Sequence, residues 1–202
     1  MHKIKEHNTL FPVFLKIEHL RTLVVGGGSV GLEKLNALLS NAPDAQVTLV
    51  ARSIHPEIKK IAAAASHVQL AEKNFSSCDL YGMDLAIIAT DNAEENKRIR
   101  DTAKSMRILV NVADTPDLCD FYLGSIVQKG NIKIAISTNG KSPTIAKRMR
   151  EILTKMIPDE MEEVLYNLVE IRKKLTGNFT EKVRELNRIT SVMVEENDLP
   201  TP

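Results

Sequence analysis

The chain is poor in cysteine, in aromatic residues and in long apolar runs. Its two cysteines, Cys78 and Cys119, lie far apart and outside any CxxC spacing, so we expect reduced thiols in a cytoplasmic protein, without a disulfide or zinc site. The five histidines form no pair at metal-ligand spacing, and no bound metal is predicted. No apolar stretch approaches the roughly 20 residues of a bilayer span, and the start lacks a signal-peptide core.

An excess of charge of one sign is also missing. The chain has 27 basic and 26 acidic residues, a balance that gives no reason to expect a nucleic-acid partner. Together with the lack of a span, it predicts a protein that binds neither nucleic acid nor membrane. A length of 202 residues suffices for one good core and a smaller appended unit.

What the chain does have is a glycine loop after a short apolar run. Gly26, Gly28 and Gly31 stand in G-x-G-x-x-G spacing, with Ser29 and Val30 between them. The first glycine permits a tight turn, the second lets the backbone approach a pyrophosphate, and the third lets the next helix pack closely. The N-terminus of that helix offers free N–H groups to phosphates. The loop predicts binding of NAD or NADP.

Short apolar runs alternate with helical patterns over the first half of the chain. The runs are residues 22–25, 47–51, 67–70, 85–89 and 108–112. Strand–helix–strand alternation implies parallel pairing with right-handed crossovers, so we predict an α/β, Rossmann-type doubly wound sheet in the order 3-2-1-4-5. Its crevice gathers the glycine loop, Thr90-Asp91 and residues 111–114, where ligands of such sheets bind.

The pattern changes after Asp114. Residues 125–128 and 132–137 flank Lys129-Gly130-Asn131 and predict a hairpin with one apolar face, which needs a partner surface. Ser142 and Pro143 begin a predicted helix that ends near Met156, before Pro158. Two further amphipathic helices are expected, over 161–175 and 182–195. We predict three parts: a dinucleotide-binding domain (1–113), a dimerisation and active-site region (114–147) and a C-terminal helical domain (148–202).

The end of the second strand bears on the choice of cofactor. NAD sites of this architecture usually place Asp or Glu there, whereas this chain has Ala51-Arg52-Ser53. Arg52 is consistent with three roles: binding the 2′-phosphate of NADP, stacking beside the adenine, or a solvated surface charge. The sequence leaves NAD against NADP open, with Arg52 and Ser53 as candidate cofactor-binding residues.

Read together, several segments resemble a known family. They are Leu10–Leu15, Leu23–Val30, Ala89-Thr90-Asp91-Asn92, Val110–Asp114, Cys119-Asp120-Phe121 and Ile134–Pro143, in this order. The set is similar to the precorrin-2 dehydrogenase / sirohydrochlorin ferrochelatase family, the N-terminal part of siroheme synthases. The resemblance covers residues 10 to about 153, and its Ser-Thr-x-Gly-Lys-Ser-Pro string is far more specific than the glycine loop. Some members carry a fused methyltransferase module, which we do not expect in a sequence of 202 residues.

The resemblance implies NAD-dependent oxidation of precorrin-2 to sirohydrochlorin and, in some members, insertion of Fe2+ as a second substrate. The family's essential acidic residue falls on Asp114. A carboxylate at the mouth of the crevice can accept a proton as hydride leaves. When the family resemblance is set aside, the sequence favours a structural role for Asp114, either in an Asx-turn or as a helix cap before Thr115-Pro116. Asp117 and Asp120 are the nearby alternatives for the same role, although we interpret them as turn and surface residues.

The substrate carries many carboxylates, so its site should present cations. Lys141, Ser142 and Arg148 are the candidate substrate-binding residues, with Lys147 and Arg150 nearby. The alternative for Lys147, Arg148 and Arg150 is the solvated face of a helix.

Other features of the resemblance concern assembly and competing functions. Gly124 and Asn139 depart from the family's usual proline and glycine, which can alter the local geometry of the hairpin, but neither is a proposed catalytic residue. Members look like homodimers joined after the nucleotide fold, and a homodimer is predicted here. Two alternatives stay open: a non-catalytic NAD(P)-binding sensor, which gives Asp114 no role, and a chelatase without redox function, against which the intact glycine loop counts.

Overall fold

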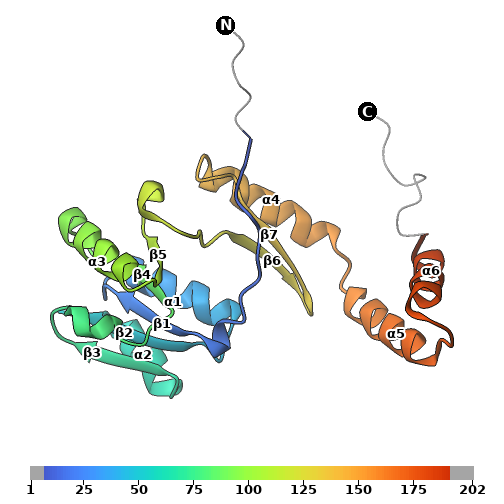
Figure 1. Cartoon of the computed structure of the whole chain (residues 1–202), viewed down its shortest axis with the longest axis horizontal. Helices are drawn as coiled ribbons and strands as arrows, with labels where there is room; N and C mark the ends of the chain where they lie inside the picture. Colours follow the sequence, from blue (N-terminus) through green and yellow to red (C-terminus); the bar gives the residue numbers. More distant parts are fainter. Residues whose placement is uncertain (1–6, 192–202) are drawn as a thin grey trace, which may run out of the picture. The chain divides into compact units, whose positions relative to one another are not determined.

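The computed structural model describes residues 7–191 (Figure 1). Contacts within the chain divide it into two compact units, with the boundary between Leu123 and Gly124. The predicted three-part division by role stays a prediction. In the part of the chain that the structure describes, no helix is long and apolar enough to cross a membrane.

The first unit is built on a parallel sheet of five strands. The strands are β1 (Arg21–Val25), β2 (Gln46–Ala51), β3 (Val68–Glu72), β4 (Leu85–Ile88) and β5 (Leu109–Val112). Their order is β3-β2-β1-β4-β5, which confirms the predicted topology. In the centre of the sheet, Val24 of β1 lies between Leu49 of β2 and Ile87 of β4. The order reverses beside β1, and this is where such sheets bind ligands.

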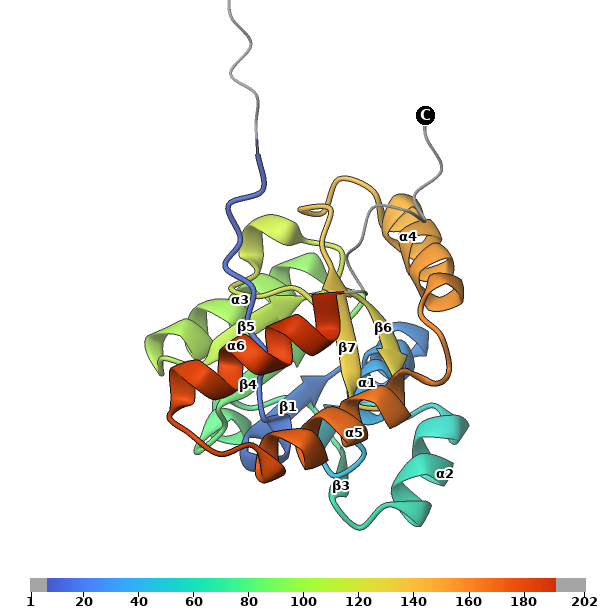
Figure 2. The ribbon, with the colours of Figure 1, turned by 90° about the vertical axis from the view of Figure 1, so that its right-hand side faces the viewer.

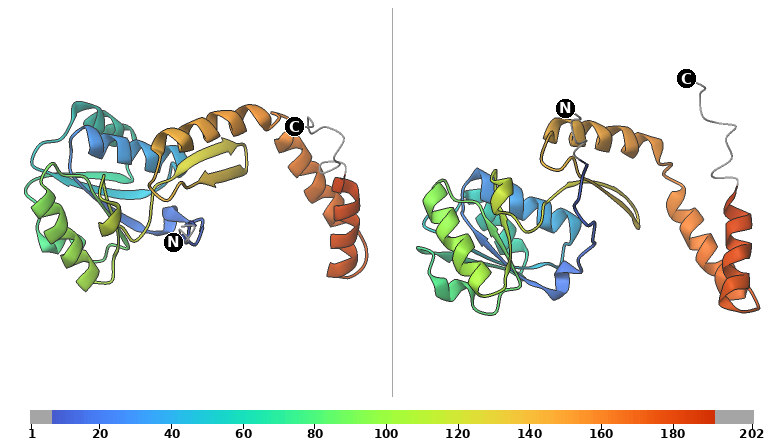
Figure 3. Two further views of the ribbon diagram at one scale, coloured as in Figure 1. Left: turned by 90° about the horizontal axis from the view of Figure 1, so that it is seen from above. Right: turned by 45° about the horizontal axis from the view of Figure 1, so that its top comes forward.

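Helices cover both faces of this sheet (Figure 3). The helices α1 (Ser29–Asn41) and α2 (Pro56–Ala64) lie on one face, where Leu35 and Ile58 join a buried apolar cluster with Val24. The helix α3 (Ala93–Ser105) lies on the other, where Ile99 joins a second cluster with Leu23. Because the strands are buried on both faces of the sheet, their sequences are continuous apolar runs and do not alternate between apolar and polar residues. Three short 3₁₀ turns complete the unit, η1 (Ile17–His19), η2 (Ser77–Leu80) and η3 (Pro116–Leu118).

The second unit begins with a hairpin packed on a helix. The antiparallel strands β6 (Ser125–Lys129) and β7 (Ile132–Ile136) pair Val127 with Ile134. Helix α4 (Pro143–Met156) begins where Ser142 Oγ accepts a hydrogen bond from the N–H of Ile145 at 3.2 Å. Val127 and Ala146 are buried, and α4 contacts the hairpin. The predicted hairpin and the predicted helix are therefore confirmed.

Two more helices form a hairpin of their own (Figure 2). They are α5 (Met161–Lys174) and α6 (Phe179–Thr190). The last helix begins before the predicted Lys182, because Asn178 and Glu181 form a capping box that starts it at Phe179. The predicted end at Glu195 lies outside the described residues.

Candidate functional site

The glycine loop joins β1 to α1 in a conformation that two of its glycines require. Gly26 has φ +121°, and a Cβ atom there would overlap the carbonyl of Ala89. A Cβ atom on Gly31 would overlap the carbonyl oxygen of Gly26. An added Cβ atom on Gly28 would meet no described atom within 4 Å, so the space above this residue is open. The first and third glycines thus serve packing, and the second faces an open space.

The start of α1 leaves donors available beside this space. Gly28 is the N-cap residue, and no side chain caps the helix. Leu32 donates its N–H to the Gly28 carbonyl at 2.9 Å, which leaves the N–H groups of the first turn without an intrahelical partner. An uncapped helix start behind an open glycine fits a phosphate group.

A cavity of about 650 Å³ opens at the carboxyl ends of β1, β2 and β4. Eight of the predicted cofactor-binding residues line it: Gly26, Gly28, Ser29, Val30, Arg52, Ser53, Thr90 and Asp91. Gly31 is buried and acts through its packing on Gly26. Five polar or aromatic lining residues were not among the predicted cofactor-binding residues: Asn74, Phe75, Asn92, Glu95 and Arg98.

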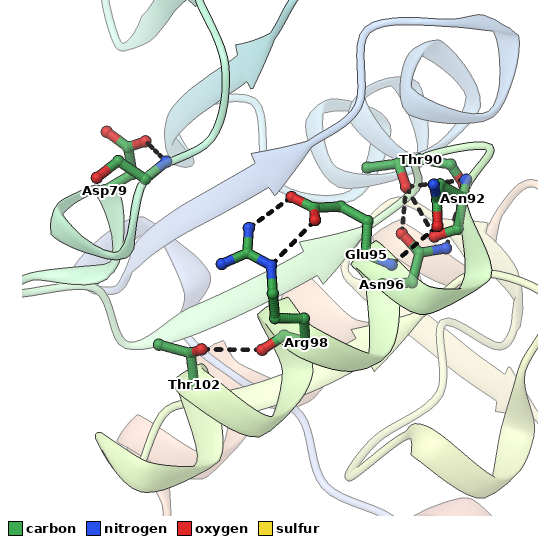
Figure 4. A network of polar contacts seen from close by, with 8 residues as sticks. Asp79, Thr90, Asn92, Glu95, Asn96, Arg98 and Thr102 are labelled. Atoms are coloured by element: carbon green, nitrogen blue, oxygen red, sulfur yellow. Dashed lines mark hydrogen bonds and ion pairs between the residues drawn. The ribbon is translucent and has the colours of Figure 1, made fainter.

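A polar network holds the loop between β4 and α3 (Figure 4). Thr90 Oγ1 donates to Asn96 Oδ1 at 2.5 Å, and Asn96 Nδ2 donates back to the Thr90 carbonyl at 3.1 Å. Asn92 Oδ1 accepts from the N–H of Glu95 at 2.9 Å and caps α3. Asn96 is 7% exposed, so a buried side-chain amide holds Thr90 and this part of the cavity wall in position.

An ion pair on α3 also faces the cavity (Figure 4). Arg98 donates to both carboxylate oxygens of Glu95, at 2.7 Å and 3.0 Å. This hydrogen bond lowers the pKa of Glu95, and the charge of Arg52 adds a smaller effect in the same direction. The Arg98 guanidinium lies 5.8 Å from the centre of the Phe75 ring, in cation–π range.

Arg52 lies in the cavity wall at the end of β2. Its side chain is exposed and forms no ion pair with any residue between 7 and 191. This location is compatible with contact to a bound cofactor. Arg52 is therefore still a candidate for binding the 2′-phosphate of NADP or for stacking beside the adenine.

Asp114 lies just beyond β5 at the same edge of the sheet. The Ala113 N–H donates to the carbonyl of Ile88 at 2.9 Å, which places Asp114 beside the strand end that leads into Thr90. Asp114 is exposed and has φ +56°, a left-handed conformation that is uncommon outside glycine. It does not belong to the cavity wall itself.

The side chain of Asp114 is not used for local structure. Thr115, and not Asp114, is the N-cap of η3. Among residues 7–191, no group forms a hydrogen bond or ion pair with the Asp114 carboxylate. In the described residues the Asp114 side chain therefore forms neither an Asx-turn nor a helix cap, although its backbone lies in a turn that the Thr115 N–H closes on the Val112 carbonyl at 3.3 Å.

The segment after Asp114 is tied back to β5 by other side chains. Cys119 Sγ interacts with both the N–H and the carbonyl of Val112 at 3.2 Å, and burial raises the pKa of this thiol. Asp120 accepts from the Val110 N–H at 3.0 Å and pairs with Lys104 at 2.6 Å. Asp120 is therefore a structural residue rather than a base, while Asp117 is exposed within η3.

The predicted substrate-binding residues lie in the second unit. Ser142 caps α4, Arg148 pairs with Glu151 at 2.7 Å, and Lys141 is exposed. Within the described residues, no group of three or more His, Cys, Asp or Glu side chains is arranged to hold a metal ion.

Comparison with known families agrees with this geometry. Residues 13–125 match the family described as "Putative NAD(P)-binding". The chain belongs to this NAD(P)-binding family. Residues 129–156 match a second family, described as "Sirohaem biosynthesis protein central", which covers β7, α4 and the Gly-Lys-Ser-Pro string.

Relatives and a solved structure extend the comparison. The chain is 36% identical over 174 residues to "Siroheme synthase" of Ruthia magnifica, covering 86% of this chain and 34% of that protein. It is 40% identical over 148 residues to "Siroheme synthase" of Psychrobacter arcticus, covering 73% of this chain and 26% of that protein. The chain thus spans about a third of the length of the curated relatives it matches.

A solved structure named "SirC, precorrin-2 dehydrogenase" matches with a TM-score of 0.71 and 24% identity, covering 89% of both chains. At this identity the match establishes the fold. The glycine loop, the start of α1 and every residue that lines the cavity lie within residues 13–125, the part of the chain that matches the NAD(P)-binding family.

Proposed function

We propose that this chain oxidises precorrin-2 to sirohydrochlorin with NAD as the oxidant, so that precorrin-2 and NAD+ give sirohydrochlorin, NADH and a proton. The observation that carries the proposal is the free Asp114 carboxylate at the sheet edge shared with the dinucleotide cavity. The fold shared with a structure named precorrin-2 dehydrogenase, and relatives named siroheme synthase, support the choice of substrate.

The residues that would hold NAD follow from the cavity. The open space at Gly28 and the uncapped start of α1, with Ser29 and Val30, suit the pyrophosphate. Arg52 and Ser53, at the end of β2, suit the adenosine ribose, and Thr90 and Asp91 complete the opposite wall. When bound, NAD supplies the hydride acceptor of the reaction.

Asp114 is the proposed general base. Loss of hydride from one carbon of the substrate must be accompanied by loss of a proton, and a carboxylate without a partner is available to take it. The left-handed backbone of Asp114 belongs to the turn that the Thr115 N–H closes on the Val112 carbonyl at 3.3 Å, and its carboxylate forms no hydrogen bond with residues 7–191.

Lys141, Ser142 and Arg148 are the proposed substrate contacts, because the tetrapyrrole is rich in carboxylates. Charge reversal at Lys141 and Arg148 should raise KM for the tetrapyrrole and leave the Kd for NAD unchanged. If both constants kept their values in K141E and R148E, these residues would have no part in substrate binding. Ser142 is tested separately, because its hydroxyl already caps α4.

Insertion of Fe2+ into sirohydrochlorin is a second candidate activity, favoured by the name of the relatives, siroheme synthase. The iron is a substrate here, and two pyrrole N–H protons leave as it binds. We propose that the same Asp114 carboxylate accepts one of them. Adding Fe2+ or Co2+ to sirohydrochlorin with the protein, without NAD, tests this step by the change in visible absorbance.

We also propose a homodimer, in the cytoplasm. Helix α4 carries an exposed apolar stripe of Ile145, Met149, Ile152 and Met156 on its outer side, while Ala146 faces the hairpin. Spacing of three and four residues puts the stripe on one face of the helix, and such a face is typical of an interface. Free cysteines at positions 78 and 119 are in keeping with a reducing compartment.

Mixing the protein with precorrin-2 and NAD+ tests the function directly. We expect absorbance of sirohydrochlorin and of NADH to rise together in equal amounts. Binding of NAD+ without any turnover would favour the alternative, a non-catalytic NAD(P)-binding sensor. Metal insertion without NADH formation would favour a chelatase that lacks the redox step.

A further inference from the structure

We infer that Glu95, on α3, makes this site selective for NAD over NADP, in place of the acidic residue that such sites usually carry at the end of β2. The inference rests on the proposed function only in that the cavity binds a nicotinamide dinucleotide. It adds a specificity-determining residue from an element that does not normally supply one.

The end of β2 cannot make the discrimination by itself. The residues there are Ala51, Arg52 and Ser53, and a lone arginine would attract the 2′-phosphate of NADP. The carboxylate nearest in register is Glu72 of β3, which lies opposite Ala51. Glu72 is committed elsewhere, because it accepts from the Ile54 N–H at 3.3 Å and from Lys59 at 2.8 Å, and it does not line the cavity.

Glu95 brings a carboxylate into the cavity from the other side. It is one of the two acidic residues in the cavity wall, with Asp91, and it acts electrostatically on Arg52 and Arg98. Asn92 fixes the start of α3 through the N–H of Glu95 itself, so the backbone of this residue is held in place. A carboxylate accepts a hydrogen bond from a ribose hydroxyl and repels a phosphate.

Arg98 is the second part of the arrangement. Glu95 engages its Nε and one terminal nitrogen, at 3.0 Å and 2.7 Å, and the guanidinium lies over Phe75. With the carboxylate present, Arg98 is neutralised and held. Without it, Arg98 would lose its ion-pair partner, and the cavity would be lined by two guanidinium groups and a single carboxylate, that of Asp91. Guanidinium groups bind phosphate.

The test compares E95Q with the matched variant E94Q by titration calorimetry with NAD+ and NADP+. Glu94 precedes Glu95 on the same exposed first turn but does not line the cavity. Wild-type protein should bind NAD+ at least about tenfold more tightly than NADP+. E95Q should bind NADP+ about tenfold more tightly than wild type does, with NAD+ affinity reduced a few-fold, and E94Q should resemble wild type.

The double variant E95Q/R98Q tests whether Arg98, which loses its ion-pair partner in E95Q, is the group that binds the 2′-phosphate of NADP+. We expect it to lose the NADP+ affinity gained by E95Q while still binding NAD+, which also shows that it is folded. Retained NAD+ binding with an unchanged preference in E95Q, or an equal change in E94Q, would overturn the inference and leave the proposed function standing. If wild-type protein bound neither NAD+ nor NADP+, both the inference about Glu95 and the proposed function would be wrong.

Discussion

At the scale of single residues, Gly28 and Gly31 have different roles: Gly31 is required for packing, and Gly28 is proposed to contact the cofactor. A methyl group on Gly31 would overlap the Gly26 carbonyl, whereas one on Gly28 would meet open space. We expect G31A to destabilise the protein by about 2 kcal/mol, because the loop and α1 must move apart. We expect G28A to keep the wild-type melting temperature and to weaken NAD binding about tenfold or more, because the methyl group occupies the space proposed for phosphate.

Thermal unfolding and calorimetry on both variants check this pair. Each variant is the control of the other, since both add one methyl group to one loop. A stable G28A that binds NAD as tightly as wild type would contradict the assignment of the loop.

The two cysteines should differ sharply in reactivity. Cys78 is exposed, whereas Cys119 interacts with the backbone of Val112 and burial raises its pKa. A raised pKa leaves less thiolate at a given pH, and the thiolate is the reactive form. At pH 8, iodoacetamide should therefore modify Cys78 well before Cys119, as followed by mass spectrometry of peptides. Equal rates at both positions would show that the segment after Asp114 opens from β5.

At the residue scale, a motif that constrains the backbone allowed the sequence to predict which residues lie together. The spacing of three glycines and the strand ends placed eight cofactor-site candidates in one cavity. Glu95 and Arg98 were missed because, at i and i+3 on an exposed helix, they look like an ordinary surface ion pair. Only the fold shows that this part of α3 borders the cavity. The missing carboxylate after β2 was the one signal that a substitute should be sought.

At the scale of elements, Ser142 provides a test of how α4 begins. Its Oγ accepts from the Ile145 N–H, and loss of such a cap typically costs about 1 kcal/mol. We expect S142A to speed amide exchange at Ile145, and S142D, which keeps a capping oxygen, to retain protection. A change in KM for the tetrapyrrole in both variants, with protection intact in S142D, would point to a direct substrate contact.

Elements were predictable to the extent that their signals are local. The five strands follow from apolar runs buried on both faces, and their order follows from the handedness of crossovers. The start of α6 was misplaced because the hydrophobic pattern begins later than the cap. Its actual signal was Asn178 three residues before Glu181, a capping box that the apolar periodicity does not reveal.

At the scale of the whole molecule, the exposed stripe of α4 predicts self-association. Ile152 is 50% exposed in the single chain, in the middle of this stripe. I152E should shift the sedimenting species from dimer to monomer, because burying a new carboxylate without a partner is unfavourable. T154E, which adds the same charge two residues further and off the stripe, should remain a dimer. A monomeric wild-type protein at micromolar concentration would rule out the dimer.

The central claim is that a carboxylate beyond β5 serves the oxidation and is separate from the dinucleotide cavity. Its most direct test is NADH formation by D114N in a single turnover with precorrin-2, alongside calorimetry with NAD+. The account predicts a rate at least about a hundredfold below wild type, with unchanged affinity for NAD+. Full activity in D114N, or loss of NAD+ binding in the folded variant, would contradict it.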